Sequence, residues 1–344
     1  MDISRRNFMK MAGLAAITAA SGVNVSEAAK RNQITTQAPT VGSTLIKDGT
    51  GSRAKVYFTR DISAKSLIKL YNKINDEIYG KVAIKLHTGE PNGPNILPRD
   101  MVQAFQAQIP DSTIVECNTL YKGKRHTTAD HRETLKINGW TFSEVDIMDA
   151  DENDAYINLP VRGGKHLQEV AMGKHIVNYD SMVVLTHFKG HAMGGFGGSM
   201  KNIAIGCASG HLGKAQVHGV DPNNVPEDYR TWPLEDYFME LMADSAKATC
   251  DYFGKHIVFI NVMRRMSVDC DCAGTRAEEP TMADIGICAS TDILAIDQAC
   301  CDFVYSASDS KDLKGRMESR HGLHQLAAMK NLKLGNDRYE LITI

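Results

Sequence analysis

Short apolar runs rich in β-branched residues recur along the sequence, and their alternation with helical patterns most limits the folds open to this chain. The runs predicted as strands are 54–58, 81–86, 112–116, 144–148, 181–186 and 256–263. Segments with apolar residues at helical spacing follow the first two runs, at 63–78 and 98–108. Such alternation is typical of an α/β fold with a mostly parallel sheet flanked by helices. The length of 344 residues allows one large α/β unit or two lobes that share a cleft, and we expect two lobes with a cleft between them.

The segment 221–236 contains three prolines and reads as an irregular crossing, so we place the boundary between the lobes there. The first α/β lobe is then 54–220 and the second lobe, with the C-terminal segment, 221–344. In the second lobe we expect helices at 237–252 and 292–305, the latter with Asp292 as its N-cap.

The N-terminus carries Arg5 and Arg6 in the sequence SRRNFMK, followed by a short apolar stretch and small residues up to Ala28. This pattern predicts a twin-arginine signal peptide over 1–28, cleaved near Ala28, and 29–53 reads as a polar linker. The apolar stretch is too short and too often interrupted to span a bilayer, so we expect no stable membrane anchor. The predicted location is periplasmic or otherwise exported, with the twin-arginine export machinery as a partner. Because that route exports folded proteins, many with a cofactor inserted, it favours a bound metal or organic cofactor.

The charge balance argues against a nucleic-acid partner. Lysine and arginine number 39 against 41 acidic residues, which gives a formal net charge of −2, and no basic patch stands out. A small-molecule ligand is therefore the expected partner.

Residues 186–206, THFKGHAMGGFGGSMKNIAIG, follow the predicted strand at 181–186 and lead into a predicted helix from Ser199. A glycine-rich turn at a helix start collects backbone N–H groups and suits an anion or an anionic cofactor. The glycines match neither the P-loop nor the dinucleotide-binding pattern. A tight structural turn is the alternative. The functional interpretation makes His191 an acid or base, and the predicted cofactor-binding residues are Lys201, Gly195, Gly197, Gly198 and Asn202.

Two further polar clusters follow predicted strands. His87 and Glu90 come after 81–86 and are of a type that binds metal or transfers protons, although such loop residues are often only solvated. The basic loop after 112–116 offers Arg125 and Lys122 to an anionic substrate, with a merely solvated loop as the alternative.

Cysteines supply a fourth group of candidates. The sequence Asp269-Cys270-Asp271-Cys272 would, if extended, place both thiols on one face, where they could chelate a soft metal, form a strained disulfide or stay reduced. None of the eight cysteines forms a C-x-x-C pair, so no local ferredoxin or zinc-ribbon motif is present. The candidate metal ligands are His187, His218, Cys270 and Cys272, with His87 a candidate for either role.

Four segments in order, 116–131, 186–208, 268–272 and 282–299, resemble the domain-of-unknown-function family 362. Many members of that family carry a two-cluster ferredoxin segment after the histidine that matches His218. Here the corresponding sequence, HGVDPNNVPEDYRTWPLED, lacks the cysteines, so the electron transfer implied for those relatives does not carry over.

The central pattern H-x-x-x-G-F-x-G-x-x-K, from His191 to Lys201, is distantly similar to the nickel-pincer lactate racemase family, with Gly197-Gly198 one place early. The resemblance implies proton transfer by His191, cofactor attachment at Lys201 and nickel ligation by His218. The cofactor itself is unknown from sequence; a metal ion, either of the nickel-pincer type or iron, is expected.

These observations predict an exported, cofactor- or metal-dependent enzyme that acts on a small anionic substrate by proton or hydride transfer, of isomerase or oxidoreductase type. Two alternatives stay open. One is a non-catalytic metal- or ligand-binding protein, and the other is an iron–sulfur oxidoreductase that uses scattered cysteines such as Cys207, Cys270 and Cys272.

Overall fold

A computed structural model describes residues 53–150 and 155–344. The predicted signal peptide at 1–28 and all but the last residue of the predicted linker lie outside these residues. None of the helices in the described part of the chain is both long enough and apolar enough to cross a membrane.

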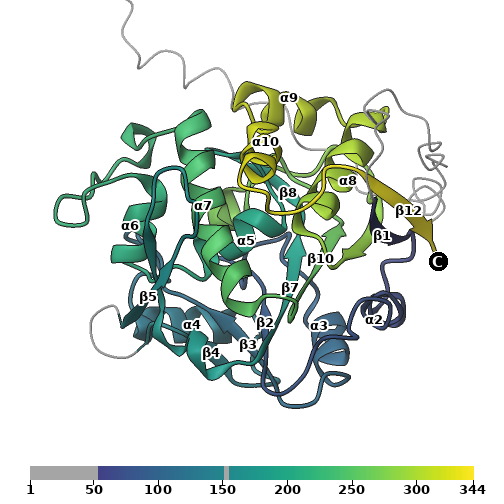
Figure 1. The fold of residues 1–344 in the computed structure, drawn as a ribbon, viewed down its shortest axis with the longest axis horizontal. Helices are drawn as coiled ribbons and strands as arrows, with labels where there is room; N and C mark the ends of the chain where they lie inside the picture. Colours follow the sequence, from purple (N-terminus) through teal and green to yellow (C-terminus); the bar gives the residue numbers. More distant parts are fainter. Residues whose placement is uncertain (1–52, 151–154) are drawn as a thin grey trace, which may run out of the picture. The chain divides into compact units, whose positions relative to one another are not determined.

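The described residues form a central eight-stranded sheet (Figure 1). Its strands, in spatial order, are β12 (Tyr339–Thr343), β1 (Ala54–Thr59), β11 (Gly286–Ser290), β10 (Ile257–Met263), β7 (Ser181–His187), β2 (Val82–Lys85), β3 (Ser112–Glu116) and β4 (Val145–Ile147). Only β11 among them runs antiparallel to its neighbours. The predicted α/β fold with a mostly parallel sheet is confirmed.

The central strands are buried on both faces, which is why they read as continuous apolar runs. In β7, Met182 and Val184 belong to one core cluster, while Val183 and Leu185 belong to the other. This alternation places a hydrophobic core on each side of the sheet.

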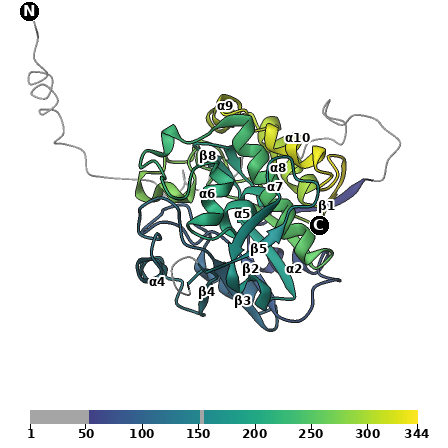
Figure 2. The same ribbon diagram turned by 60° about the vertical axis from the view of Figure 1, so that its left-hand side comes forward.

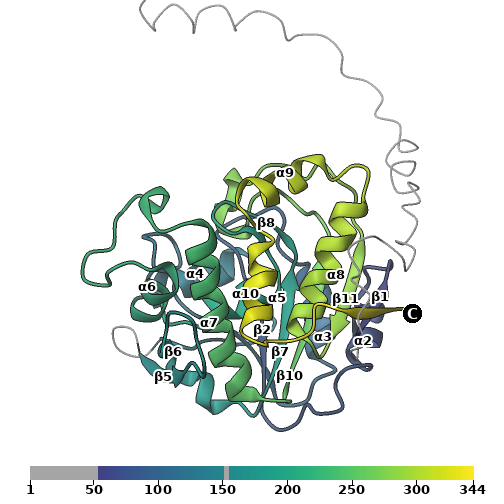
Figure 3. The same ribbon diagram turned by 45° about the horizontal axis from the view of Figure 1, so that its top comes forward.

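Helices cover both cores (Figure 3). On the side of Val183 lie α2 (Ala64–Tyr71), α3 (Arg99–Gln106) and α4 (Thr128–Ile137). On the side of Val184 lie α5 (Ser199–Gly206), α6 (Leu212–His218), α7 (Glu235–Phe253), α8 (Ile293–Ser306), α9 (Lys311–Ser319) and α10 (His324–Asn331). Figure 2 shows α6 beside α5.

Most of the predicted elements are present with boundaries shifted by one or two residues, and Asp292 caps α8 by accepting a hydrogen bond from the Ala295 amide at 2.9 Å. The helix predicted over 63–78 ends early, at Tyr71. Two small hairpins were not predicted: β5 (Tyr156–Pro160) with β6 (Glu169–Gly173), and β8 (Lys189–His191) with β9 (Gly195–Gly197).

The predicted division into lobes at 221–236 is not confirmed. Strands from both sides of that segment share the one sheet, since β10 pairs with β7 and β11 pairs with β1. The segment instead leads from α6 into α7 across one core.

The carboxyl ends of the parallel strands meet at one edge of the sheet. His87 follows β2, Cys117 follows β3, His187 ends β7, and Arg264 follows β10. Ligands of open α/β sheets bind at such an edge.

Candidate functional site

Three soft ligating side chains converge at this edge. His87 comes from the end of β2, and Cys270 and Cys272 flank the start of a 3₁₀ turn, η3 (Asp271–Arg276). One ligand atom of each lies within 4.8 Å of the other two. The backbone turns at Asp271, so residues 269–272 are not extended, yet both thiols lie close to His87.

Two thiolates and an imidazole match the Cys₂His ligand set of catalytic zinc sites, which leaves a fourth coordination position open. His87 Nδ1 already accepts a hydrogen bond from the Gly89 amide at 2.9 Å, so Nε2 is the nitrogen available to an ion. An ion bound there would move the ring proton to Nδ1 and release the Gly89 amide. The residues therefore fit a soft divalent metal ion, provided that the hydrogen bond from the Gly89 amide to His87 is given up.

The two thiols differ electrostatically. The Cys272 thiol donates toward Cys270 and lowers the pKa of Cys270 well below its usual range, helped by Lys201 and Lys189. The same hydrogen bond, with burial, raises the pKa of Cys272. Cysteine binds metals as the thiolate, and the two nearby lysines favour this form of Cys270.

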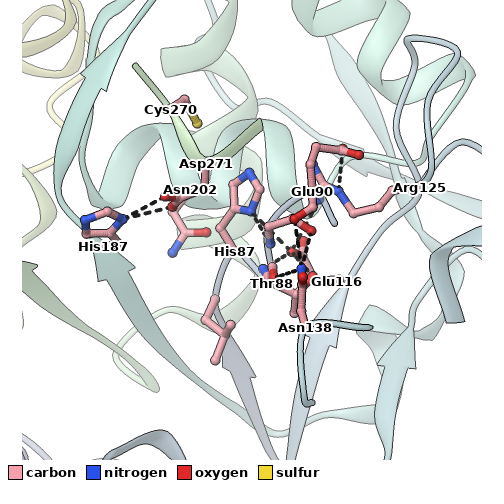
Figure 4. Close-up of polar contacts among 12 residues, drawn as sticks. His87, Thr88, Glu90, Glu116, Arg125, Asn138, His187, Asn202, Cys270 and Asp271 are labelled. Atoms are coloured by element: carbon pink, nitrogen blue, oxygen red, sulfur yellow. Dashed lines mark hydrogen bonds and ion pairs between the residues drawn. The ribbon is translucent and has the colours of Figure 1, made fainter. Parts of the chain in front are cut away.

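Asp271 anchors the cysteine segment to β7 and β8. Its carboxylate lies 2.9 Å from His187 Nδ1 and 3.0 Å from Lys189 Nζ, with all three side chains buried. Burial alone would raise the pKa of Asp271, but His187 and Lys189 hold it below its usual range. Figure 4 shows the hydrogen-bonded Asp271 and His187 together with His87 and Cys270.

His187 is not placed as a metal ligand. Its Nδ1 faces the Asp271 carboxylate and its Nε2 lies 2.7 Å from the Arg264 carbonyl oxygen. Both partners only accept hydrogen bonds, so both ring nitrogens must donate and neither keeps a lone pair for a metal. The predicted ligand is instead a support for Asp271.

The first turn of α5 does not receive an external anion as predicted. The Asp297 carboxylate, from α8, accepts hydrogen bonds from the Ser199 and Met200 amides at 2.8 and 3.0 Å and from Asn261 Nδ2 at 2.8 Å. Burial raises the pKa of Asp297 to about 6. The protein's own carboxylate thus fills the anion site of this helix N-terminus.

The three predicted cofactor-binding glycines have local packing roles. Gly198 lies against Asp297, where a Cβ atom would be 2.5 Å from Oδ1. Gly195 has a φ of +79° and lies against the Gly322 backbone. Gly197 lies beside the side chains of Lys201 and Lys189.

Among the described residues, Lys201 lacks a carboxylate partner and His191 has an unpaired Nε2–H. Lys201 Nζ is 4.0 Å from Cys270 Sγ, and no carboxylate in the described part of the chain pairs with it. His191 Nδ1 accepts from the Gly194 amide at 3.0 Å, so its Nε2 carries the proton and has no partner among the described residues. Burial and Lys201 hold the pKa of His191 well below its usual range. His191 is therefore a neutral hydrogen-bond donor, not a proton acceptor at Nε2.

His218 has the opposite tautomer. Its Nδ1 donates to the Lys214 carbonyl oxygen at 2.7 Å, and its ring packs against Trp232 and Phe238. Burial lowers the pKa of His218 to about 4, and Lys201 adds to this effect. The Nε2 lone pair stays free to accept a proton or a metal ion, an arrangement typical of ligating histidines.

The polar groups of the predicted substrate-binding residues and of Asn202 are engaged by other residues of the protein. Arg125 is buried and donates to Glu90 at 2.8 Å and to the Tyr121 hydroxyl at 2.8 Å, whereas Lys122 is exposed and pairs with Glu227 at 2.8 Å. Asn202 binds Lys85 Nζ at 3.1 Å beneath the site.

Sequence reasoning missed the buried pair beneath the cluster. Lys85 Nζ lies 3.1 Å from Glu116, which also accepts from the Thr88 amide at 2.7 Å. Burial would raise the pKa of Glu116, but Lys85, His87 and Arg125 lower it below its usual range. The detectable signal was a charged residue inside each of two buried strands, VAIK and STIVE.

Cys207 does not join the other thiols. It lies beside Cys117, whose Sγ is 3.5 Å from the Cys207 carbonyl oxygen, and it is absent from the His87 cluster. Of the cysteines named for an iron–sulfur centre, Cys270 and Cys272 meet, but Cys207 does not join them in the described residues.

A family model described as "Domain of unknown function (DUF362)" matches residues 82–302. No curated protein matches the chain. Two solved structures are similar in part. The lactate racemase apoprotein from Thermoanaerobacterium thermosaccharolyticum is 16% identical, with a TM-score of 0.38, over 74% of this chain and 57% of that one. A protein from Thermotoga maritima is 9% identical, with a TM-score of 0.36, over 80% and 60%. The chain thus spans less than two thirds of either structure.

Proposed function

The chain belongs to the DUF362 family, and on that premise we propose that it is a metal-dependent enzyme whose ion is held by His87, Cys270 and Cys272. The observation that carries the proposal is the convergence of these three ligand atoms within 4.8 Å. Lys201 Nζ, which has no carboxylate partner in the described residues, lies 4.0 Å from Cys270 Sγ, and the Nε2–H of His191 is also without a partner there. A site that only stored metal would need no such groups. We therefore favour an enzyme over a non-catalytic metal-binding protein.

The substrate proposed is a small anion, and the reaction is proton transfer of the isomerase type. A bound divalent ion would supply Lewis acidity toward a substrate oxygen. The Nε2 lone pair of His218 takes a proton from the substrate and returns it to complete the isomerisation, and its Nδ1–H bond to the Lys214 carbonyl fixes that tautomer. Because burial lowers the pKa of His218 to about 4, the ring would hold this proton only briefly. The neutral His191 donates its Nε2–H to an oxygen on which negative charge develops. Export through the signal at Arg5 and Arg6 remains part of the proposal.

Metal analysis of the full chain tests the proposal. The protein is purified from its native host, and bound metals are counted by elemental analysis in wild type and in His87→Ala and Cys270→Ser/Cys272→Ser variants. Cys250→Ser is the matched control, because Cys250 lies outside the cluster. We expect one soft divalent ion per chain in wild type and control, and its loss in the two cluster variants. Equal metal content in all four proteins would refute the site.

A further inference from the structure

Lys201 is a buried cation without a carboxylate. The residue is 8% exposed, and within the described ranges the hydrogen-bond partner of its ammonium is Cys270 Sγ, at 4.0 Å. Two other cations act on the same thiols, but Lys189 pairs with Asp271 at 3.0 Å and Arg125 pairs with Glu90 at 2.8 Å. Lys201 alone of these three depends on the thiolate for its counter-charge.

Metal binding changes that balance. Two thiolates and a neutral imidazole around a divalent ion carry no net charge, so Cys270 no longer offsets the charge of Lys201. A buried ammonium group without a counter-charge is energetically unfavourable unless an anion binds next to it. The fourth coordination position of the ion opens beside the same sulfur atom.

His191 supplies a second donor toward this region. It is 7% exposed, and its Nε2–H has no partner among the described residues. The preceding residue, Gly190, donates its amide to the Ser267 carbonyl oxygen at 2.7 Å, which holds β8 against the segment that leads to Cys270. A buried Lys201 without a carboxylate partner and a buried His191 with an unpaired Nε2–H favour a small ligand that only accepts hydrogen bonds.

We propose that Lys201 and His191 form a subsite for a small carboxylate or comparable oxyanion, and that this subsite is completed when the His87–Cys270–Cys272 site holds its metal ion. The inference rests on the proposed function, since it needs the metal site. It assigns Lys201 a non-covalent role as the counter-charge of the ligand. Metal and anion then bind cooperatively, each strengthening the other by the same factor.

The test measures Zn²⁺ affinity of the full-length protein by chelator competition, with acetate as the probe anion and acetamide as its neutral isostere, at constant pH and ionic strength. We expect acetate to tighten Zn²⁺ binding by about tenfold in wild type, within the usual range of coupling between sites. Acetamide leaves the affinity unchanged. Lys201→Met abolishes the acetate effect, and Lys201→Arg retains part of it.

Lys122→Met is the control, because Lys122 is an exposed lysine paired with Glu227 and keeps the full effect. His191→Phe keeps Lys201, and we expect it to weaken the effect of acetate on Zn²⁺ affinity. This variant replaces Lys201→Met as the test if Lys201→Met does not fold. Zn²⁺ binding without any acetate effect in wild type overturns the inference and leaves the proposed function standing. An acetate effect that persists in Lys201→Met also overturns it, and failure of wild type to bind Zn²⁺ overturns both.

Discussion

The Asp297 carboxylate lies 2.8 Å from the Ser199 amide, at the position where the first turn of α5 would otherwise bind an external anion. Because Asp297 comes from α8, a helix distant in the sequence, the glycine-rich segment is held in place by the protein itself. In the proposed subsite, the anion is therefore bound by the side chains of Lys201 and His191 and not by this helix N-terminus.

Asp297→Asn tests this anchor through the pH dependence of stability. Burial raises the pKa of Asp297 to about 6 in the folded protein, above the ordinary value of 3.8. Its favourable contribution is therefore complete below pH 3.8 and is lost as the pH rises through about 6. We expect denaturant unfolding of the variant to lack this decline between pH 4 and 6. The asparagine amide also leaves one backbone donor unsatisfied, at a cost of about 1–3 kcal/mol. An unchanged pH profile would contradict the assignment.

Gly198→Ala tests the same contact by steric means. A Cβ atom there would lie 2.5 Å from Asp297 Oδ1, so the carboxylate or the turn must shift. We expect a loss of about 1–3 kcal/mol in the free energy of unfolding. Gly315→Ala in α9 is the matched control, because nothing lies within 4 Å of its added Cβ, and alanine favours a helix. If both variants were equally stable, the close packing at Gly198 would be disproved.

Sequence patterns predicted the strands well because β7 and β10 are buried on both faces and their apolar runs are unmistakable. They also identified Cys270 and Cys272 as possible ligands, and His87 as a candidate separately. That these residues meet depends on the order in which β2, β7 and β10 lie in the sheet, which no local pattern encodes. The roles of His187 and Asp297 depend on hydrogen bonds between residues 84 and 98 positions apart, and these were equally invisible.

Asp271→Asn should destabilise the cysteine segment. The change removes the negative charge that pairs with Lys189 and His187, which are buried and have no other carboxylate in the described residues. Breaking such a buried pair costs about 3–5 kcal/mol, measured by urea unfolding. Asp269→Asn is the neighbouring control, since Asp269 pairs with Arg316 near the surface and should cost less than about 1 kcal/mol. Similar losses of unfolding free energy in the two variants would show that the buried Asp271 contacts stabilise the protein no more than the surface pair does.

Metal removal should lower the melting temperature of the wild-type protein. An ion that binds only the folded state adds about 3 kcal/mol of stability when its free concentration exceeds Kd a hundredfold. We expect a chelator to lower the melting temperature of wild type and of Cys250→Ser, and to leave Cys270→Ser unaffected. Backbone hydrogen exchange at Gly89 should accelerate when metal is bound, because His87 Nδ1 then ceases to accept its hydrogen bond. Chelator-induced destabilisation of Cys270→Ser as large as that of wild type would place the ion elsewhere.

His218 and Asp297 should change the free energy of unfolding in opposite directions over overlapping pH ranges. Burial lowers the pKa of His218 to about 4 from an ordinary value of 6.5, so the unfolded chain binds the extra proton first. The stability it contributes is present above pH 6.5 and is lost as the pH falls toward about 4. We therefore expect His218→Gln to flatten an increase of stability between pH 4 and 6.5, whereas Asp297→Asn flattens a decrease. NMR titration of the His218 ring checks the cause directly, because a midpoint near 6.5 would mean that the ring is solvated and that its Nε2 is not held neutral by burial.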